Sequence, residues 1–131
     1  IIKLRKDVYK TISLWEREYK KGFTAYMILL FLLKEKKYGY QITTDLCNMT
    51  NNKVLFKESA VYQILKKLRK KKFVVSEWAK SKKGPNRKYY RITKSGKELV
   101  KDFSKEFIIP INKGMQEQLQ LNFDLKKMEE N

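Results

Sequence analysis

Two strand-like segments joined by a short basic loop limit the folds open to this chain of 131 residues more than any other feature. Residues 73–79 and 87–92 are rich in β-branched and aromatic residues, which favour strands. The loop between them, KSKKGPN at 80–86, holds a glycine, a proline and polar residues that are typical of turns. The segments on either side of this hairpin show helical periodicity instead. We therefore expect a mainly α protein with one small β-hairpin.

Two helices are expected at the start of the chain. Residues 4–20 carry apolar side chains at steps of three and four, on one stripe, and Gly22 is expected to end that helix. Phe23 and Thr24 then resemble a helix start, with Thr24 as the N-cap and Phe23 packing one turn further along. This second helix is expected to run to about residue 37.

Two shorter helices, at about 40–49 and 58–71, are expected before the hairpin. Polar residues between 48 and 52 mark the end of the first of them. The second has an apolar face for the core, formed by Val61, Ile64, Leu65 and Leu68. The order helix, helix, turn, helix and two-stranded hairpin is that of a winged helix-turn-helix.

A last helix is expected after the hairpin, with Thr93 as its N-cap. Proline lacks an amide hydrogen, so Pro110 is expected to kink this helix. The apolar stripes of the first and last helices are longer than a small domain can cover, which predicts a dimer. We divide the chain into dimerisation helices at 1–21 and 94–131 and a winged domain at 22–93. The residues expected at the dimer interface are Leu4, Val8, Ile12, Trp15, Leu99, Phe103, Phe107, Ile111 and Met115.

Positive charge is concentrated in one part of the chain. Lysine and arginine number 31 against 14 acids, a net charge of +17. Residues 53–91 hold fourteen basic residues and only two acids, Glu58 and Glu77, whereas residues 92–131 hold seven of each. A lysine-rich composition alone would spread the excess evenly. The uneven distribution indicates a binding face for a polyanion.

The residue types that are missing exclude several kinds of chemistry. Histidine is absent and Cys47 is the only cysteine, which removes the common zinc sites, histidine-dependent nucleophilic catalysis and any disulfide within one chain. The acids are scattered, and no glycine-rich phosphate loop occurs. We expect no enzyme, no cofactor and no metal, and we expect Cys47 to be a small buried residue.

The helix at 58–71 and the hairpin tip form the expected DNA-binding face. A helix about 10 Å across fits a major groove about 12 Å wide, and no acid interrupts the outer face after Glu58. Gly84 has no side chain, so backbone amides beside it can approach a phosphate. The expected contacts are Ser59, Tyr62, Gln63, Lys66 and Lys67 on the helix, and Lys82, Lys83, Gly84, Arg87 and Lys88 in the hairpin.

The other large side chains of the hairpin are expected in different environments. Tyr90 and Ile92 share one strand face and are expected in the core of the wing. Tyr89 lies on the opposite face and fits either the core or the DNA side. Trp78 is expected to pack between sheet and helix rather than to touch DNA.

Three segments together resemble the PadR family of bacterial and archaeal transcription regulators: KYGYQI at 37–42, SAVYQILKKLRKKKFV at 59–74 and GPNRKYYRIT at 84–93. The resemblance covers about residues 24–100, and the wing segment is its most specific part. It implies a dimer on a pseudo-palindromic operator, usually a repressor, with the terminal helices at the dimer interface.

The resemblance also implies roles for single residues. Tyr62 and its neighbours would meet the major groove, Arg87 and Lys88 the DNA backbone or minor groove, and Tyr40 a phosphate. The chain departs from the family at 57–60, where Lys-Glu-Ser-Ala replaces a run such as Ser-Pro-Gly-Thr.

An aromatic effector pocket is a further expectation. Trp15, Tyr19, Phe103 and Phe107 lie on the two terminal stripes, and flat apolar molecules bind between such rings. The resemblance implies such a pocket as well, since some members of the PadR family bind aromatic compounds near this interface. The alternative is that these rings simply pack on each other as dimer core.

Two other functions remain open at this point. A sequence-tolerant architectural protein that coats DNA would also carry a high net charge. A basic peripheral membrane protein would need a basic amphipathic helix outside a compact fold. The apolar run at 25–33 is too short to cross a bilayer, which needs about 20 residues. No secretory signal is recognisable, so we expect a cytoplasmic protein. With its DNA-binding face, we expect it to be prokaryotic and nucleoid-associated, and to bind double-stranded DNA and no membrane.

Overall fold

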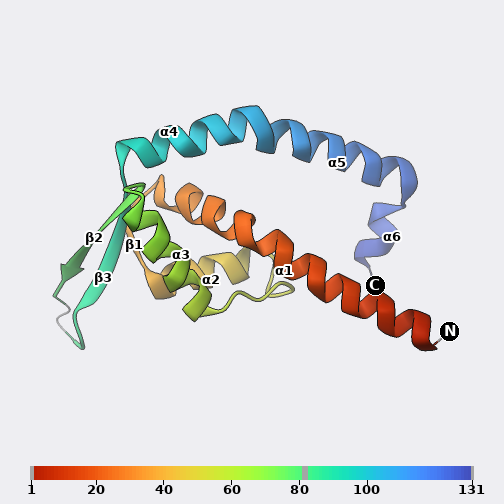
Figure 1. The fold of residues 1–131 in the computed structure, drawn as a ribbon, viewed down its shortest axis with the longest axis horizontal. Helices are drawn as coiled ribbons and strands as arrows, with labels where there is room; N and C mark the ends of the chain where they lie inside the picture. Colours follow the sequence, from red (N-terminus) through yellow and green to blue (C-terminus); the bar gives the residue numbers. More distant parts are fainter. Residues whose placement is uncertain (1, 81–82, 131) are drawn as a thin grey trace. The chain divides into compact units, whose positions relative to one another are not determined.

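The computed structural model describes residues 2–80 and 83–130, with side chains from Arg5 onward in those ranges. The chain forms two compact units, Ile1–Lys97 and Glu98–Asn131. The first unit holds three helices, a small sheet and the start of a fourth helix, and the second unit is helical (Figure 1). Among the residues described, no helix is long and apolar enough to cross a membrane.

The first helix, α1, runs without a break over Ile2–Leu32. The expected break at Gly22 is wrong, because open space surrounds this glycine and good helix formers flank it. Glycine costs a helix only about 0.5–1 kcal/mol, which such neighbours offset. Thr24 is therefore a buried interior residue rather than an N-cap. The helix ends before residue 37, since Lys37–Tyr38 form the short strand β1.

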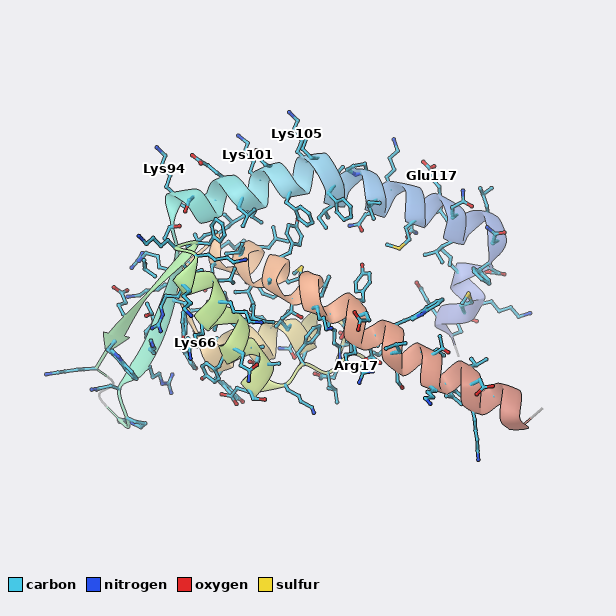
Figure 2. The ribbon with its side chains drawn as sticks, in the orientation of Figure 1. Arg17, Lys66, Lys94, Lys101, Lys105 and Glu117 are labelled. Atoms are coloured by element: carbon cyan, nitrogen blue, oxygen red, sulfur yellow. The ribbon has the colours of Figure 1, made fainter. Side chains whose placement is uncertain are left out.

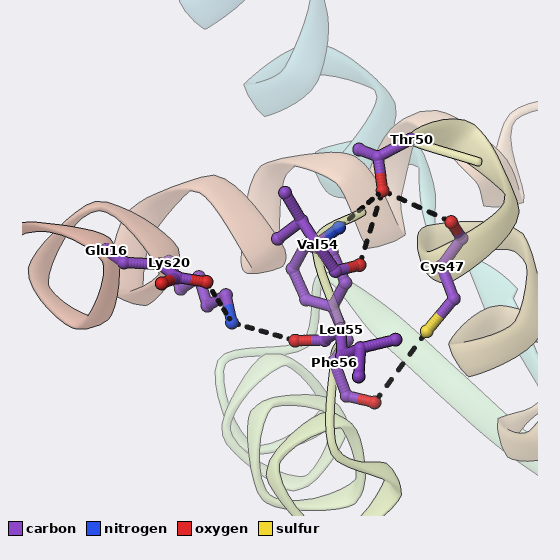
Figure 3. Close-up of polar contacts among 7 residues, drawn as sticks. All are labelled: Glu16, Lys20, Cys47, Thr50, Val54, Leu55 and Phe56. Carbon is purple, nitrogen blue, oxygen red and sulfur yellow. Dashed lines mark hydrogen bonds and ion pairs between the residues drawn. The ribbon is translucent and has the colours of Figure 1, made fainter. Parts of the chain in front are cut away.

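Two helices follow, α2 at Gly39–Met49 and α3 at Glu58–Lys70, close to their expected bounds. Thr50 closes the turn after α2: its hydroxyl donates to the Cys47 carbonyl and accepts from the Val54 amide at 3.0 Å (Figure 3). Asn51 and Asn52 adopt positive φ, which asparagine tolerates better than most residues. The burial expected for Cys47 is wrong: it is only half-buried, because it lies near the end of α2 beside the segment that leads into α3 rather than in the core.

The hairpin consists of β2 at Val74–Ala79 and β3 at Arg87–Ile92, as the sequence predicts. Strand β3 lies in the middle of an antiparallel sheet of order β1-β3-β2. Strand β1 was not predicted from the sequence, since two residues are too few to show a strand pattern. The core of this unit is built from α1, α2, α3 and the sheet: Ile28, Leu29, Leu32, Ile42, Leu46, Val61, Leu65, Leu68, Val74, Tyr90 and Ile92.

The helix after the hairpin, α4 at Lys94–Phe103, begins with Thr93 as its N-cap. The Thr93 hydroxyl accepts from the Gly96 amide at 3.1 Å, as the sequence predicts, and donates to the Lys72 carbonyl at 2.8 Å. A β-carbon on Gly96 would overlap the backbone of Phe73, so only glycine fits there.

A π-helical turn at Ser104–Ile108 and helix α5 at Ile109–Asn122 continue the chain. The π-turn lies just before Pro110, whose ring and missing amide disturb the regular hydrogen-bond ladder. The expected single helix to residue 131 is interrupted, because Phe123 is extended and Asp124 caps the short helix α6, Leu125–Glu129.

Candidate nucleic-acid interface

Helix α3 buries one face and exposes the other. Val61, Leu65 and Leu68 lie in the core. The opposite face is exposed and carries the residues Ser59, Tyr62, Gln63, Lys66, Lys67 and Lys70. Figure 2 shows Lys66 among the side chains of α3. Lys57 occupies the N-cap position and gives no side-chain cap, which agrees with the departure from the family at this point.

Tyr62 is anchored against the start of α2 rather than free. Its ring lies where a β-carbon on Gly39 would be, so the glycine makes room for it. Tyr62 remains 42% exposed, which leaves part of the ring accessible on the outer face. Burial, followed by a hydrogen bond with Glu58, raises the pKa of Tyr62 above its usual value.

Tyr38 links the wing to the start of α2, a role that no pattern in the sequence indicates. The Arg87 guanidinium lies 4.5 Å from the centroid of its ring, and the Tyr89 ring meets it edge-on at 5.6 Å. The Tyr40 ring is 59% exposed and stacks on the Tyr38 ring, with the two centroids 6.4 Å apart. The pairing of Tyr38 with Tyr89 across β1 and β3 brings these side chains together. Arg87 and Tyr40 thus reach one surface from two elements.

The buried places expected for Tyr90 and Ile92 are confirmed. The place expected for Trp78 is wrong, because its side chain is 69% exposed. Trp78 lies on the same strand face as Val74, in agreement with the alternation of a strand. However, the far half of the hairpin extends beyond the helices of the first unit (Figure 1), and among the residues described there none buries the Trp78 ring. Tyr89 is half-buried, with Lys36 Nζ 5.2 Å from its ring centroid.

Glu77 is one of the two acids of the basic segment, and two cations neutralise it. Its Oε1 lies 3.1 Å from both Lys36 Nζ and Arg91 Nη2. Hydrogen bonds, first from Lys36 and then from Arg91, lower the pKa of Glu77 below its usual value. The carboxylate therefore adds no net repulsion toward a polyanion at the wing.

The hairpin tip is described in part. Gly84 has φ of +132°, a conformation that side-chain-bearing residues avoid, so this position requires glycine. Lys83 and Arg87 are exposed and Lys88 is half-buried. Lys82 lies outside the described residues.

The segment before α3 is tied to α1. Lys20 Nζ donates to the Leu55 carbonyl at 2.7 Å and pairs with Glu16 at 3.3 Å (Figure 3). A groove of about 740 Å³ lies beside this bridge, between α1 and the first turns of α3, and Arg17 and Lys57 are among its lining residues. A second groove of about 540 Å³ is lined by Trp15 and Tyr19 and shares Lys20 and Phe56 with the first. Neither groove was foreseen, since both depend on α1 continuing past Gly22.

The expected effector residues occur as two separate pairs. Trp15 and Tyr19 are exposed on α1 of the first unit. Phe103 and Phe107 stack in the second unit, with ring centroids 5.0 Å apart. The residues expected at the dimer interface are exposed wherever their side chains are described; the side chain of Leu4 lies outside that range.

Known proteins share both the sequence and this fold. Residues 28–102 match the model of the transcriptional regulator PadR-like family. An uncharacterised protein of Lysinibacillus sphaericus is 35% identical over 87 residues, which cover 66% of this chain and 80% of that protein.

Solved structures of other proteins are similar to the chain, among them those of two Bacillus proteins. A PadR-like transcriptional regulator from Bacillus cereus is 29% identical, with a TM-score of 0.66 over 79% of this chain and 97% of that one. Bacillus subtilis PadR, solved in complex with operator DNA, is 30% identical, with a TM-score of 0.55 over 60% of this chain and 45% of that one. The family is one of regulators rather than enzymes. The chain belongs to the PadR-like family of transcriptional regulators.

Proposed function

We propose that this transcriptional regulator binds an operator through α3 and the wing. The outer face of α3 carries the proposal: from Ser59 to Lys70 it offers hydroxyl, amide and ammonium donors and no carboxylate. Such a face suits the major groove, where base edges and phosphates accept hydrogen bonds. Tyr62, Gln63 and Lys66 read the groove, while Arg87, Lys88 and Tyr40 contact the backbone. The similarity to Bacillus subtilis PadR, which was solved in complex with operator DNA, supports binding to an operator.

The regulator acts as a homodimer on a pseudo-palindromic site. Exposed apolar residues recur on α1, at Val8, Ile12 and Trp15, and on the C-terminal helices, at Phe103, Phe107 and Ile111. Lys101 and Lys105 project from the same side of the C-terminal helix (Figure 2), which leaves its apolar stripe on another side. Two-fold pairing would place two copies of α3 about 34 Å apart, one turn of DNA.

Repression is the outcome that we propose for this binding, because a dimer seated on an operator blocks polymerase. A small aromatic compound is the proposed releasing ligand, supported by the exposed rings of Trp15 and Tyr19 beside the 540 Å³ groove. Its effect requires a different affinity for the free and DNA-bound states. Titrating planar aromatic compounds against tryptophan emission and operator affinity tests this; no response in either contradicts it.

DNase footprinting at physiological salt tests the operator proposal. A discrete protected region with two-fold symmetry is the expected result. Uniform protection along the fragment would support the second candidate, an architectural protein that coats DNA, which the net charge of +17 favours.

A further inference from the structure

We propose that Trp78 and Lys88 on the wing form a contact site for the sugar–phosphate backbone of duplex DNA, with the indole against deoxyribose and the ammonium on phosphate. The inference rests on the proposed function: it adds Trp78 to the DNA-binding residues, and it pairs Trp78 with Lys88, which is already proposed to contact the backbone. It starts from the exposure of Trp78, which the fold leaves uncovered although its side of the strand is the core side.

The inner face of the hairpin changes from core to surface along its length. Its first two residue pairs are Val74 with Ile92 and Ser76 with Tyr90, and the third pair is Trp78 with Lys88. Val74, Ile92 and Tyr90 are at most 7% exposed, whereas Trp78 is 69% exposed. The Arg69 guanidinium reaches Ser76 at 3.4 Å, so α3 still accompanies the second pair. The third pair therefore continues, without a break, the surface on which α3 lies.

The chemistry of the third pair suits a nucleic-acid backbone. Lys88 Nζ lies 5.8 Å from the centroid of the Trp78 ring and 6.0 Å from that of Tyr90, so the ammonium is close to both rings. Such a placement restricts the long lysine side chain before DNA arrives. The nearest acid in sequence, Glu77, points to the other face of the strand and is paired there. In the DNA backbone an apolar sugar alternates with an anionic phosphate. The Trp78 ring can therefore pack on a sugar while the Lys88 ammonium beside it pairs with the neighbouring phosphate.

The experiment uses the full chain and a labelled 30-base-pair duplex of mixed sequence at low salt, because backbone contacts do not depend on sequence. Affinity is measured by anisotropy and tryptophan emission is followed in the same titration. The chain has two tryptophans, Trp15 and Trp78, so Trp78→Phe isolates the emission change of Trp78 by difference. Val75→Ala is the matched control, since Val75 is exposed on the opposite face of the same strand.

Trp78→Ala is expected to weaken binding about 10-fold, as the loss of one large aromatic contact at an interface does, with an unchanged melting temperature. Emission should change as DNA saturates the wild type and should not change in Trp78→Phe, whereas Val75→Ala should bind like the wild type. Lys88→Gln should lower the salt slope by about one unit. The inference would be overturned if the wild type bound DNA without a change in emission and Trp78→Ala bound as tightly as the wild type. That result would leave α3 as the DNA-binding element. A wild type that does not bind the duplex would remove the proposed function and this contact together.

Discussion

The ring of Tyr62 on α3 occupies the space directly over Gly39 at the start of α2, where a β-carbon would overlap it. The glycine is thus required by its neighbour rather than by its own backbone, since its φ is not positive. The contact fixes one of the aromatic residues of the proposed DNA-binding face.

Gly39→Ala is therefore expected to destabilise the fold by about 1–2 kcal/mol, as overpacking does. In a Tyr62→Ala background the same change should cost nothing, because the overlapping ring is gone, and this coupling can be read from urea denaturation of the four proteins. Gly22→Ala is the control: open space surrounds Gly22, so alanine there should stabilise α1 by about 0.5–1 kcal/mol. Equal costs of Gly39→Ala with and without the Tyr62 ring would refute the contact.

The ion pairs of Glu77 predict part of the pH dependence of stability. Lys36 and Arg91 hold the pKa of Glu77 below its usual value of 4.5, so the folded state favours the carboxylate. The stabilisation is complete above pH 4.5 and is lost as the pH falls through the lower pKa of the folded state. Glu77→Gln should melt at a lower temperature than the wild type at pH 7, and the difference should shrink toward pH 3. A difference that stays constant over this range would show that the ion pairs do not contribute.

The dimer predicts a clear response to charge placed on the apolar stripe. Phe103 and Phe107 stack on each other and are 39% and 47% exposed. Replacing both with glutamate should convert a dimer into a monomer in analytical ultracentrifugation, since two buried charges per protomer oppose association. Lys101→Glu with Lys105→Glu, on another side of the same helix, should remain dimeric. An intact chain that sediments as a monomer at micromolar concentration would contradict the proposed assembly.

Local patterns in the sequence predicted most of the fold. The 3.6-residue stripe of α3, the alternation of the two hairpin strands and the Thr93 cap are signals carried by consecutive residues, and the structure places all three as expected. The errors came from the balance between competing signals. Gly22 and Thr24 suggested a helix boundary, but the helix formers around them keep α1 continuous.

What the sequence could not supply depends on distant residues. Trp78 lies on the strand face that the alternation predicts, but its side chain is exposed. Whether a residue on that face is buried depends on the length of the hairpin relative to the helices, which no local pattern shows. The position of Tyr38 between Arg87, Tyr89 and Tyr40 follows from the pairing of β1 with β3, residues some fifty positions apart. The Lys20–Leu55 hydrogen bond likewise requires a continuous α1.

The central claim is that α3 and the wing carry DNA binding, and the salt dependence of affinity tests it most directly. Operator affinity of the wild type should fall with salt at a log–log slope of roughly −5 to −9, as expected for six to ten phosphate contacts. Lys66→Glu combined with Arg87→Glu should weaken binding at least about 100-fold at 150 mM salt and flatten the slope by about two units or more. Lys113→Glu with Lys126→Glu makes the same charge change in the second unit and should keep most of the affinity. Equal affinity and slope for the first double variant and the wild type would contradict the account.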